Sequence, residues 1–460
     1  MKVSSELQSP VEKEPLPRVV LLYDPRSISP MVISEGAAGI CRIIWVVDSS
    51  DEVISPLIRL LRRLGDVVDS AGLDPASLAS ALRPLSPQGI ATQSDSQMPL
   101  AADLAERLSL VFHSASTAAC LADKYLQRRK LRAAGVPGPN VWEVSARVSG
   151  KAGYQDRLAE IAEQANFPVV VKPRRSAGSV ATARANNMQE LLDLISRIGD
   201  RPGGLLIEEY LQSLGEDSDY ADDISVEMFV QHGTTYPLVT LGKFKLAPPF
   251  RGRGNFLPSH LESATTSMVF MQAELAVAAL GIRDGFVDID IKLTPAGPRV
   301  VEVNGRIGGN VPELVDLAGG PRMLPLWFKA ALGDDVAHGS EIANLASGVW
   351  DSIAYFAWVQ PPMSATRVID VAGFDNVAAL CHTTSVIPNR FSGDAVDWSM
   401  GGITHVCAVY GAVSTHSELV IARAEIDAAI SLQCEHGPES ESSGSGSWLV
   451  SEQANRLAIA

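Results

Sequence analysis

Short apolar runs separated by helical periodicity open the chain. The runs RVVLLY (18–23) and RIIWVV (42–47) do not alternate with polar residues, which is typical of strands buried on both faces of a parallel sheet. A helical pattern over 53–64 and another short run at 66–68 follow. This alternation predicts a parallel α/β unit over residues 18–113. Because no G-x-G-x-x-G follows the first strand, a dinucleotide site is not predicted there.

The pattern changes near residue 114. A helix over 116–134 is predicted to stop at Gly135, with Pro137 shortly beyond its end. Two late strands joined by the turn TPAG are expected to pair with each other. The other predicted elements of this part are strands at 169–172, 205–208 and 224–230, a glycine-rich turn at 174–180, and helices at 187–198 and 268–280, with the paired strands at 285–293 and 298–303.

The last part of the chain predicts a smaller domain. Several short β runs are followed by a helical pattern at 417–432, which indicates an α+β arrangement. The two ends are rich in Ser, Glu, Pro or Gly, and we expect them to be disordered. The expected organisation is a flexible N-terminus (1–17), an α/β domain (18–113), a central domain (114–335), a small α+β domain (340–435) and a flexible tail (436–460).

Composition and charge limit the function. The 460 residues are 46% hydrophobic and 20% charged, as in folded globular proteins. Acidic residues outnumber basic ones by 53 to 38, and the net charge of −15 argues against binding to nucleic acid or to anionic membranes. The five cysteines form no C-x-x-C pair, so we expect a reducing cytoplasm and no disulfide framework or zinc site. The polar N-terminus has no signal core, and no run approaches the about 20 apolar residues that span a bilayer.

Oxygen ligands stand out in the two late strands. Asp288 and Asp290 lie on one strand, and Glu302 and Asn304 lie on the next. Residues i and i+2 share a face of a strand, so three or four oxygens converge if the strands are neighbours. Mg²⁺ prefers such oxygens together with substrate phosphates. Arg306 follows, and its guanidinium suits the clamping of an anionic substrate.

A lysine and a loop of small residues form a second group. Lys172 ends an apolar strand, and Ser176, Gly178 and Ser179 follow in a loop whose backbone N–H groups can cradle phosphates. The loop is not a Walker A motif, and alone it is no stronger a signal than an ordinary turn. In a third group, LLIEEYL (205–211), an apolar strand meets paired acids, which suits a hinge where adenine stacks.

Taken together and in order, these segments resemble the ATP-grasp superfamily. That family has a lysine in an early D-K helix, a lysine before a Gly/Ser-rich loop, an acidic hinge, and a late acidic strand followed by E-x-N-x-R. The matching residues here are Asp123-Lys124, Lys172 with Ser176 to Ser179, Glu208-Glu209-Tyr210-Leu211, and Asp290 with Glu302, Asn304 and Arg306. The resemblance covers residues 114–335 and implies an ATP-grasp fold preceded by a Rossmann-like domain.

Within that superfamily, the chain is most similar to the L-amino acid ligases, which make dipeptides or related amides. The segment LGKFKLAPPFRGRGNFLPSHL (241–261) resembles their T-E-K…P-P-x-F…G-x-x-x-P motif, and the C-terminal region resembles their small final domain. Three positions depart from the family. The first metal acid is Asp290 where Glu is usual, an acidic insertion (216–222) precedes the expected ribose residue Asp223, and Leu-Gly precedes Lys243 in place of Thr-Glu.

The resemblance implies a reaction and a set of roles. A carboxylate attacks the γ-phosphate of ATP to give an acyl phosphate and ADP, and an amine then displaces phosphate to form an amide. Lys172 and Arg306 are the implied catalytic residues, and Asp288 rivals Asp290 as a metal ligand. The implied contacts are Mg²⁺ or Mn²⁺, as one or two ions, at Asp290, Glu302 and Asn304; phosphates at Lys124, Lys172, Ser176, Gly178 and Ser179; adenosine at Glu208, Glu209, Tyr210, Leu211 and Asp223; and substrate at Arg306, Gly309, Asn310 and Lys243.

Three functions stay open at this point: an amide-forming ligase, an ATP-grasp enzyme of another reaction such as a biotin-carboxylase-like or formate-activating enzyme, and a non-catalytic nucleotide-binding module. The segment from Leu241 argues against the second, and intact Lys172, Glu302 and Arg306 argue against the third. His232 and His260 are candidate general bases, with ordinary polar contacts as the alternative. The expected partners are a small carboxylate and an amine, free or carried on a protein, for a monomer or homodimer.

Overall fold

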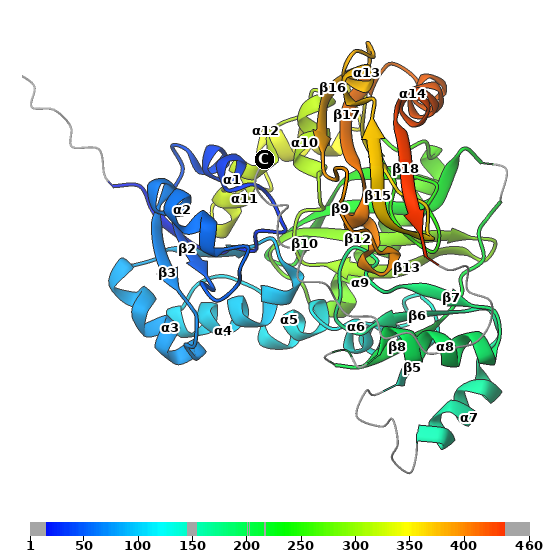
Figure 1. Ribbon diagram of the computed structural model, residues 1–460. Helices are drawn as coiled ribbons and strands as arrows, with labels where there is room; N and C mark the ends of the chain where they lie inside the picture. Colours follow the sequence, from blue (N-terminus) through cyan, green and yellow to red (C-terminus); the bar gives the residue numbers. More distant parts are fainter. Residues whose placement is uncertain (1–14, 145–153, 200, 202, 216–217, 438–460) are drawn as a thin grey trace, which may run out of the picture.

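The computed structural model describes residues 15–144, 154–199, 201, 203–215 and 218–437. Figure 1 shows an α/β unit at the left, a large sheet at the right and a smaller sheet below it. The α/β unit contains a parallel sheet in the order β3-β2-β1-β4. Its elements are β1 (Arg18–Leu22), α1 (Pro30–Ala37), β2 (Arg42–Val47), α2 (Ile58–Leu64), β3 (Asp66–Asp69), α3 (Pro75–Leu82), β4 (Gly89–Thr92) and α4 (Met98–Leu108).

Both faces of this parallel sheet are covered, as the unbroken apolar runs predicted. Val20 and Ile44 point toward α3 and α4, whereas the alternate residues Leu21 and Trp45 point toward α1 and α2. Helix α11 (Met323–Ala331), some 300 residues later in the chain, packs into the second of these layers through Leu324 and its neighbours. The α/β unit is therefore joined to the rest of the molecule by a shared apolar core.

The smaller sheet is antiparallel, in the order β5-β8-β6-β7. Its inward residues, such as Val171 and Ile207, pack against two helices in a core of their own. The elements are β5 (Val141–Val144), α7 (Tyr154–Gln164), β6 (Val169–Pro173), β7 (Ala183–Ala185), α8 (Met188–Ile198) and β8 (Leu205–Glu209).

The larger sheet has the order β13-β12-β9-β10-β11-β14-β17-β16. One face buries Val226 and Ile289 against helices α5, α6 and α9. Its strands are β9 (Tyr220–Gln231), β10 (Thr234–Phe244), β11 (Gly254–Leu257), β12 (Gly285–Thr294), β13 (Gly297–Asn304), β14 (Ile353–Val359), β16 (Thr383–Pro388) and β17 (Cys407–Val413). Because β14, β16 and β17 extend the same sheet, the strands before and after the predicted domain boundary near residue 340 belong to one sheet.

The remaining elements complete the two sides of this sheet. A separate ribbon pairs β15 (Ala365–Ala372) with β18 (Ser431–His436). The helices are α5 (Ala115–Leu121), α6 (Lys124–Ala133), α9 (Ser263–Leu280), α10 (Val311–Leu317), α12 (Ser340–Ala346), α13 (Phe374–Ala378) and α14 (His416–Ala429).

The helix predicted at 268–280 begins earlier, at Ser263, and the one predicted at 53–64 is a 3₁₀ turn (Ser55–Leu57) followed by α2. Two further predicted helices run across a break in the structure. The helix predicted at 116–134 is two helices, because Asp123 ends one and caps the next by accepting bonds from the N–H groups of Tyr125 and Leu126. The helix predicted at 417–432 ends at Ala429, and the residues after Ile430 form β18. In both places apolar periodicity continued across a real break, so pattern alone did not reveal it.

Among the described residues, one helix, α9, has the length and mean hydropathy (1.2) of a membrane span. Its face formed by Val269, Ala273 and Val277 is buried in the core beneath the large sheet, as in a core helix of a folded domain. The five cysteines are all unbridged thiols.

Candidate active site

The predicted oxygen ligands meet on the antiparallel pair β12 and β13. Asp288 lies opposite Asn304, and Asp290 lies opposite Glu302. The amide nitrogen of Asn304 donates to Asp288 Oδ2 at 3.2 Å. The structure therefore brings all four side chains onto one face of two neighbouring strands.

Each of the two outer acids is paired with a lysine from another element. Glu302 lies 2.7 Å from Lys124 Nζ, and Asp290 forms an ion pair with Lys243 and accepts from Ser225 Oγ at 2.8 Å. Burial opposes the ionisation of Asp290, but Lys243 and Ser225 outweigh it and hold the pKa below its ordinary value. Asp288 has the opposite shift, because burial and the Asp290 charge both raise its pKa.

These residues fit a magnesium site that is completed by substrate. Over the described part of the chain, no three His, Cys, Asp or Glu side chains gather into a ligand set of their own. Asp290, Glu302 and Asn304 supply two carboxylates and an amide, and Mg²⁺ commonly takes one or two carboxylates together with phosphates and waters. The lysines that pair with the two acids are also suited to phosphate, so nucleotide and metal can replace these pairs together.

A buried charge network stands beneath the predicted nucleotide site. Glu208 lies 2.7 Å from Lys172 Nζ and 3.0 Å from Arg128 Nε, and all three side chains are less than one-tenth exposed. Burial opposes the ionisation of Glu208, but Arg128 and Lys172 hold its pKa below the ordinary value. Burial is the largest effect on Lys172 and lowers its pKa. Among the described groups, neither Nη atom of Arg128 finds a partner, so two buried donors remain for a ligand.

The loop after Lys172 has an unusual backbone. Gly178 has φ of +64°, and the non-glycine residues Ser179 and Ala181 have φ of +60° and +49°. Lys124 Nζ donates to the carbonyl of Ser176, which holds one end of this loop close to helix α6. We call residues 176–181 the phosphate loop.

The predicted adenosine residues have more varied contacts. Glu209 accepts from the backbone and side-chain nitrogens of Asn140, each at 3.1 Å. The Tyr210 ring lies under the Arg184 guanidinium at 4.6 Å, and Leu211 follows at the end of β8. Asp223, expected at the ribose, is ion-paired with Lys292 at 3.0 Å.

Arg306 is held by two acids from different parts of the chain. Its Nη1 donates to Asp288 Oδ2 at 3.1 Å, and its Nη2 donates to Asp95 Oδ2 at 3.0 Å. Burial lowers the pKa of Arg306, but Asp95 and Asp288 raise it more strongly, so it stays charged. Asp95 comes from the α/β unit and was not predicted, because 211 residues separate it from Arg306.

The turn after Arg306 is fixed by two further contacts. The backbone N–H of Gly308 donates to Glu227 Oε1 at 3.0 Å, and Asn310 Oδ1 accepts from the hydroxyl of Tyr410 at 2.6 Å. Gly309 between them is exposed. Glu227 lies opposite Asp288 on β9, so only the strand register, which the sequence does not encode locally, could have identified it.

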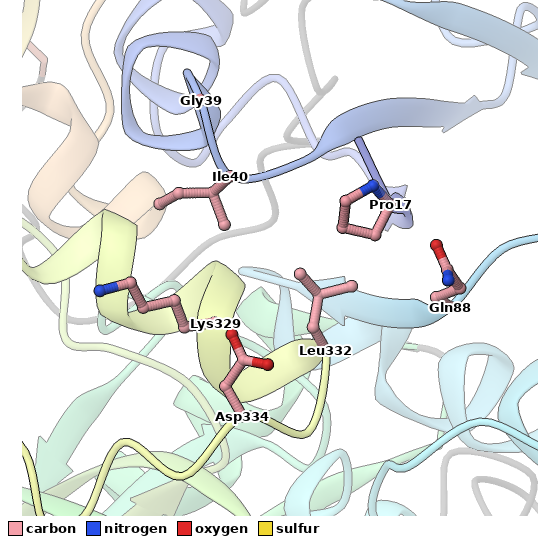
Figure 2. Close-up of a pocket in the computed structure, with 7 residues that line it drawn as sticks. All are labelled: Pro17, Gly39, Ile40, Gln88, Lys329, Leu332 and Asp334. Carbon is pink, nitrogen blue, oxygen red and sulfur yellow. The ribbon is translucent and has the colours of Figure 1, made fainter. Parts of the chain in front are cut away.

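The two candidate histidines have different surroundings. His232 is 82% exposed and lies 3.7 Å from Asp284. The ring of His260 packs against the rings of Tyr220 and Phe256. A hollow of about 430 Å³ lies between the α/β unit and the end of α11. Figure 2 shows its lining residues, which include Ile40 and Lys329. None of its seven lining residues belongs to the predicted site.

The family model described as an ATP-grasp domain matches residues 121–310. The chain contains an ATP-grasp domain. The solved structure of L-amino acid ligase from Bacillus licheniformis resembles the whole arrangement, with a TM-score of 0.71 and 17% identity over 92% of this chain and 100% of that one. The predicted ATP-grasp fold is confirmed, and so is the resemblance to that superfamily.

Two curated relatives align over part of the chain. Uncharacterized protein y4rH of Sinorhizobium fredii is 25% identical over 313 residues, which are 60% of this chain and 61% of that protein. Dapdiamide A synthase of Enterobacter agglomerans is 24% identical over 253 residues, which are 52% of this chain and 55% of that enzyme. The ATP-grasp chain therefore spans between half and two-thirds of the length of these two relatives.

Proposed function

We propose that the protein is an ATP-dependent carboxylate–amine ligase that forms an amide through an acyl phosphate and releases ADP and phosphate. The observation that carries this proposal is the convergence on one site of three separate segments, which supply Lys124, Lys172, and Glu302 with Arg306. The names of an amino-acid ligase and of dapdiamide A synthase among similar proteins support amino acids or small carboxylic acids as substrates.

The position of each residue is compatible with a specific role in this reaction. Lys124 and Lys172 would bind the phosphates of ATP, with the phosphate loop covering them. Asp290, Glu302 and Asn304 would hold Mg²⁺ or Mn²⁺, which neutralises charge on the phosphates when bound. Arg306 would hold the carboxylate and then the acyl phosphate, since Asp95 and Asp288 keep its guanidinium in place. Glu208 and the hinge after it would position the adenosine.

A screen for phosphate release tests the reaction class. Purified protein with Mg-ATP is offered single acids, single amines, and pairs of the two, and both ADP and phosphate are measured. We expect turnover that requires both members of a pair. ADP release with bicarbonate or formate alone would instead indicate the alternative ATP-grasp reaction, and nucleotide binding without turnover for any pair would indicate a binding module.

The variant Glu302→Ala tests the metal assignment. We expect ADP formation to fall at least a hundredfold, because losing a charge clamp of this kind costs about 3 kcal/mol of transition-state stabilisation. Glu106→Ala is the control, since Glu106 is an exposed acid on α4. Turnover that survives Glu302→Ala would overturn the assignment. Comparing Asp290→Asn with Asp288→Asn in their requirement for Mg²⁺ identifies which acid holds the ion.

A further inference from the structure

A C-terminal segment reaches the phosphate loop from more than two hundred residues away. Two short 3₁₀ turns, Trp398–Thr404, precede β17; we call this segment the latch. The N–H of Gly402 donates to the carbonyl of Gly178 at 3.0 Å, and the N–H of Ala181 donates to the carbonyl of Ser399 at 2.6 Å. The latch and the phosphate loop are thus paired backbone to backbone, in both directions.

The contact admits only glycine at its centre. Gly401 has φ of +69° and separates the two turns of the latch. A Cβ at this position would lie 2.2 Å from the carbonyl oxygen of Gly178 and 2.8 Å from backbone atoms of Ser179 and Val180. Backbone atoms cannot move aside as a flexible side chain can, so any larger residue would push the phosphate loop away.

The latch itself rests on the large sheet. Gln360, directly after β14, donates through Nε2 to the carbonyl of Gly402 at 2.9 Å and accepts from Thr404 Oγ1 at 3.1 Å. The ring of His405 stacks on Trp358 of β14 at 4.7 Å, with 14° between the planes. The phosphate loop, by contrast, connects β6 and β7 of the small sheet. The latch therefore joins the two sheets that flank the nucleotide site.

The phosphate loop needs outside support. Ser179 and Ala181 adopt positive φ, which costs of order 1 kcal/mol or more for residues with a Cβ and persists only where the surroundings fix it. The bonds from Ala181 to Ser399 and from Gly402 to Gly178 fix the backbone at these positions. We propose that the latch holds the phosphate loop in its nucleotide-binding conformation, with Gly401 as the positioning residue that permits the contact. This inference rests on the proposed function, since it takes the loop to bind phosphates.

The test compares two glycines with the same backbone conformation. Gly348 has φ of +68° and open space where a Cβ would lie, with no atom within 4 Å, whereas Gly401 has φ of +69° and meets the loop. Gly401→Ala and Gly348→Ala therefore introduce similar local strain, but only the first disturbs the loop. We expect Gly401→Ala to weaken the binding of Mg-ADP, measured by calorimetry, at least tenfold, and Gly348→Ala to leave it within twofold.

The outcomes separate the two proposals. If wild-type protein binds no Mg-ADP, the proposed function fails; if it binds and Gly401→Ala binds as well or more tightly, the latch fails. Hydrogen exchange on the wild-type protein tests the role of the latch even if Gly401→Ala does not fold. Mg-ADP should slow exchange in the peptides covering 176–182 and 398–404 together, because the amide N–H groups of Ala181 and Gly402 form the two hydrogen bonds between the phosphate loop and the latch. Slower exchange in the first peptide alone would overturn the latch.

Discussion

Glu227 is a buried acid that forms no ion pair among the described residues, and the charge of Arg306 only partly offsets the effect of its burial. Its Oε1 accepts from the N–H of Gly308, whereas no described group pairs with its Oε2. Burial, followed by the charge of Asp288, raises its pKa well above the ordinary value. This shift favours the neutral form of Glu227, which holds the turn after Arg306 through its bond to Gly308. A Cβ on Gly308 would lie 2.2 Å from Glu227 Oε1, so a larger residue at this position would displace the carboxyl group.

Substituting Glu227 tests its protonation state. Glu227→Gln has the size and bonding of the neutral acid, so the free energy of unfolding should change by less than about 1 kcal/mol. Glu227→Ala leaves a cavity and an unpaired N–H, and should cost about 3 kcal/mol. Because the folded pKa is raised, wild-type protein should lose stability as pH rises above about 4.5, and the Gln variant should lack this part of the pH dependence. Denaturant titrations at several pH values measure both, and a Gln variant as unstable as the Ala variant would contradict the assignment.

Some residues of the candidate site could be predicted from local sequence patterns, whereas others are brought there by tertiary packing. The convergence of Asp290, Glu302 and Asn304 could be predicted, because a spacing of two places side chains on one face of a strand. Arg128 lies in a stretch with the pattern of a basic helix surface, although its side chain is buried against Glu208. Asp95 arrives from a different unit altogether. Their roles follow from tertiary packing, which leaves no short-range pattern in the chain.

At the level of elements, the break between α5 and α6 serves the site. Asp123 caps α6 and also accepts from Arg174 at 2.7 Å, next to the phosphate loop. Lys124 therefore begins α6 and reaches both Glu302 and the carbonyl of Ser176. One local signal marked this break, an Asp at a capping position, but the apolar periodicity on both sides favoured a single helix. Three strands of the α/β unit, β1, β2 and β3, were by contrast predicted within a residue or two, since each contains an uninterrupted apolar run, whereas β4 was not predicted.

The stability of the latch should depend on pH through His405. Burial, with Arg390 nearby, lowers the pKa of His405 from 6.5 to about 4. Between these values the unfolded chain binds a proton that the folded chain does not, so stability should fall as pH drops from 6.5 to 4, by at most about 3 kcal/mol. His405→Phe keeps a ring on Trp358 but cannot titrate, and should flatten this part of the pH profile. His338→Gln, which changes a histidine whose side chain is 78% exposed, is the control. An unchanged slope in the Phe variant would show that folding does not lower the pKa of His405.

At the level of the whole molecule, three parts of the chain converge on the turn after Arg306. The α/β unit supplies Asp95, the central strands supply Asp288 and Glu227, and Tyr410 of β17 reaches Asn310. The C-terminal region also supplies the latch at the other side of the nucleotide site. Because β14 and β17 extend the sheet that holds the proposed metal ligands, this region is connected to the site by continuous backbone pairing. Composition and local patterns predicted separate units. The order of their strands within one sheet, however, depends on pairing between segments that are distant in the sequence.

Removing the ion pair between Asp95 and Arg306 tests how much the α/β unit contributes to the reaction. Asp95→Asn keeps the size of the side chain but removes one charge that fixes Arg306, while Asp288 still holds the other side. We expect turnover to fall about tenfold, equivalent to about 1.4 kcal/mol, with the affinity for Mg-ADP unchanged, because we propose that Arg306 holds the acid substrate and not the adenosine. Glu35→Gln is the matched control, since Glu35 and Arg322 also pair across the two units at 2.9 Å but are both more than half exposed. An exposed pair of this kind contributes little, so its loss should leave turnover unchanged. If Asp95→Asn and Glu35→Gln behave alike, the α/β unit acts only as a scaffold, and Asp288 alone is sufficient to orient Arg306.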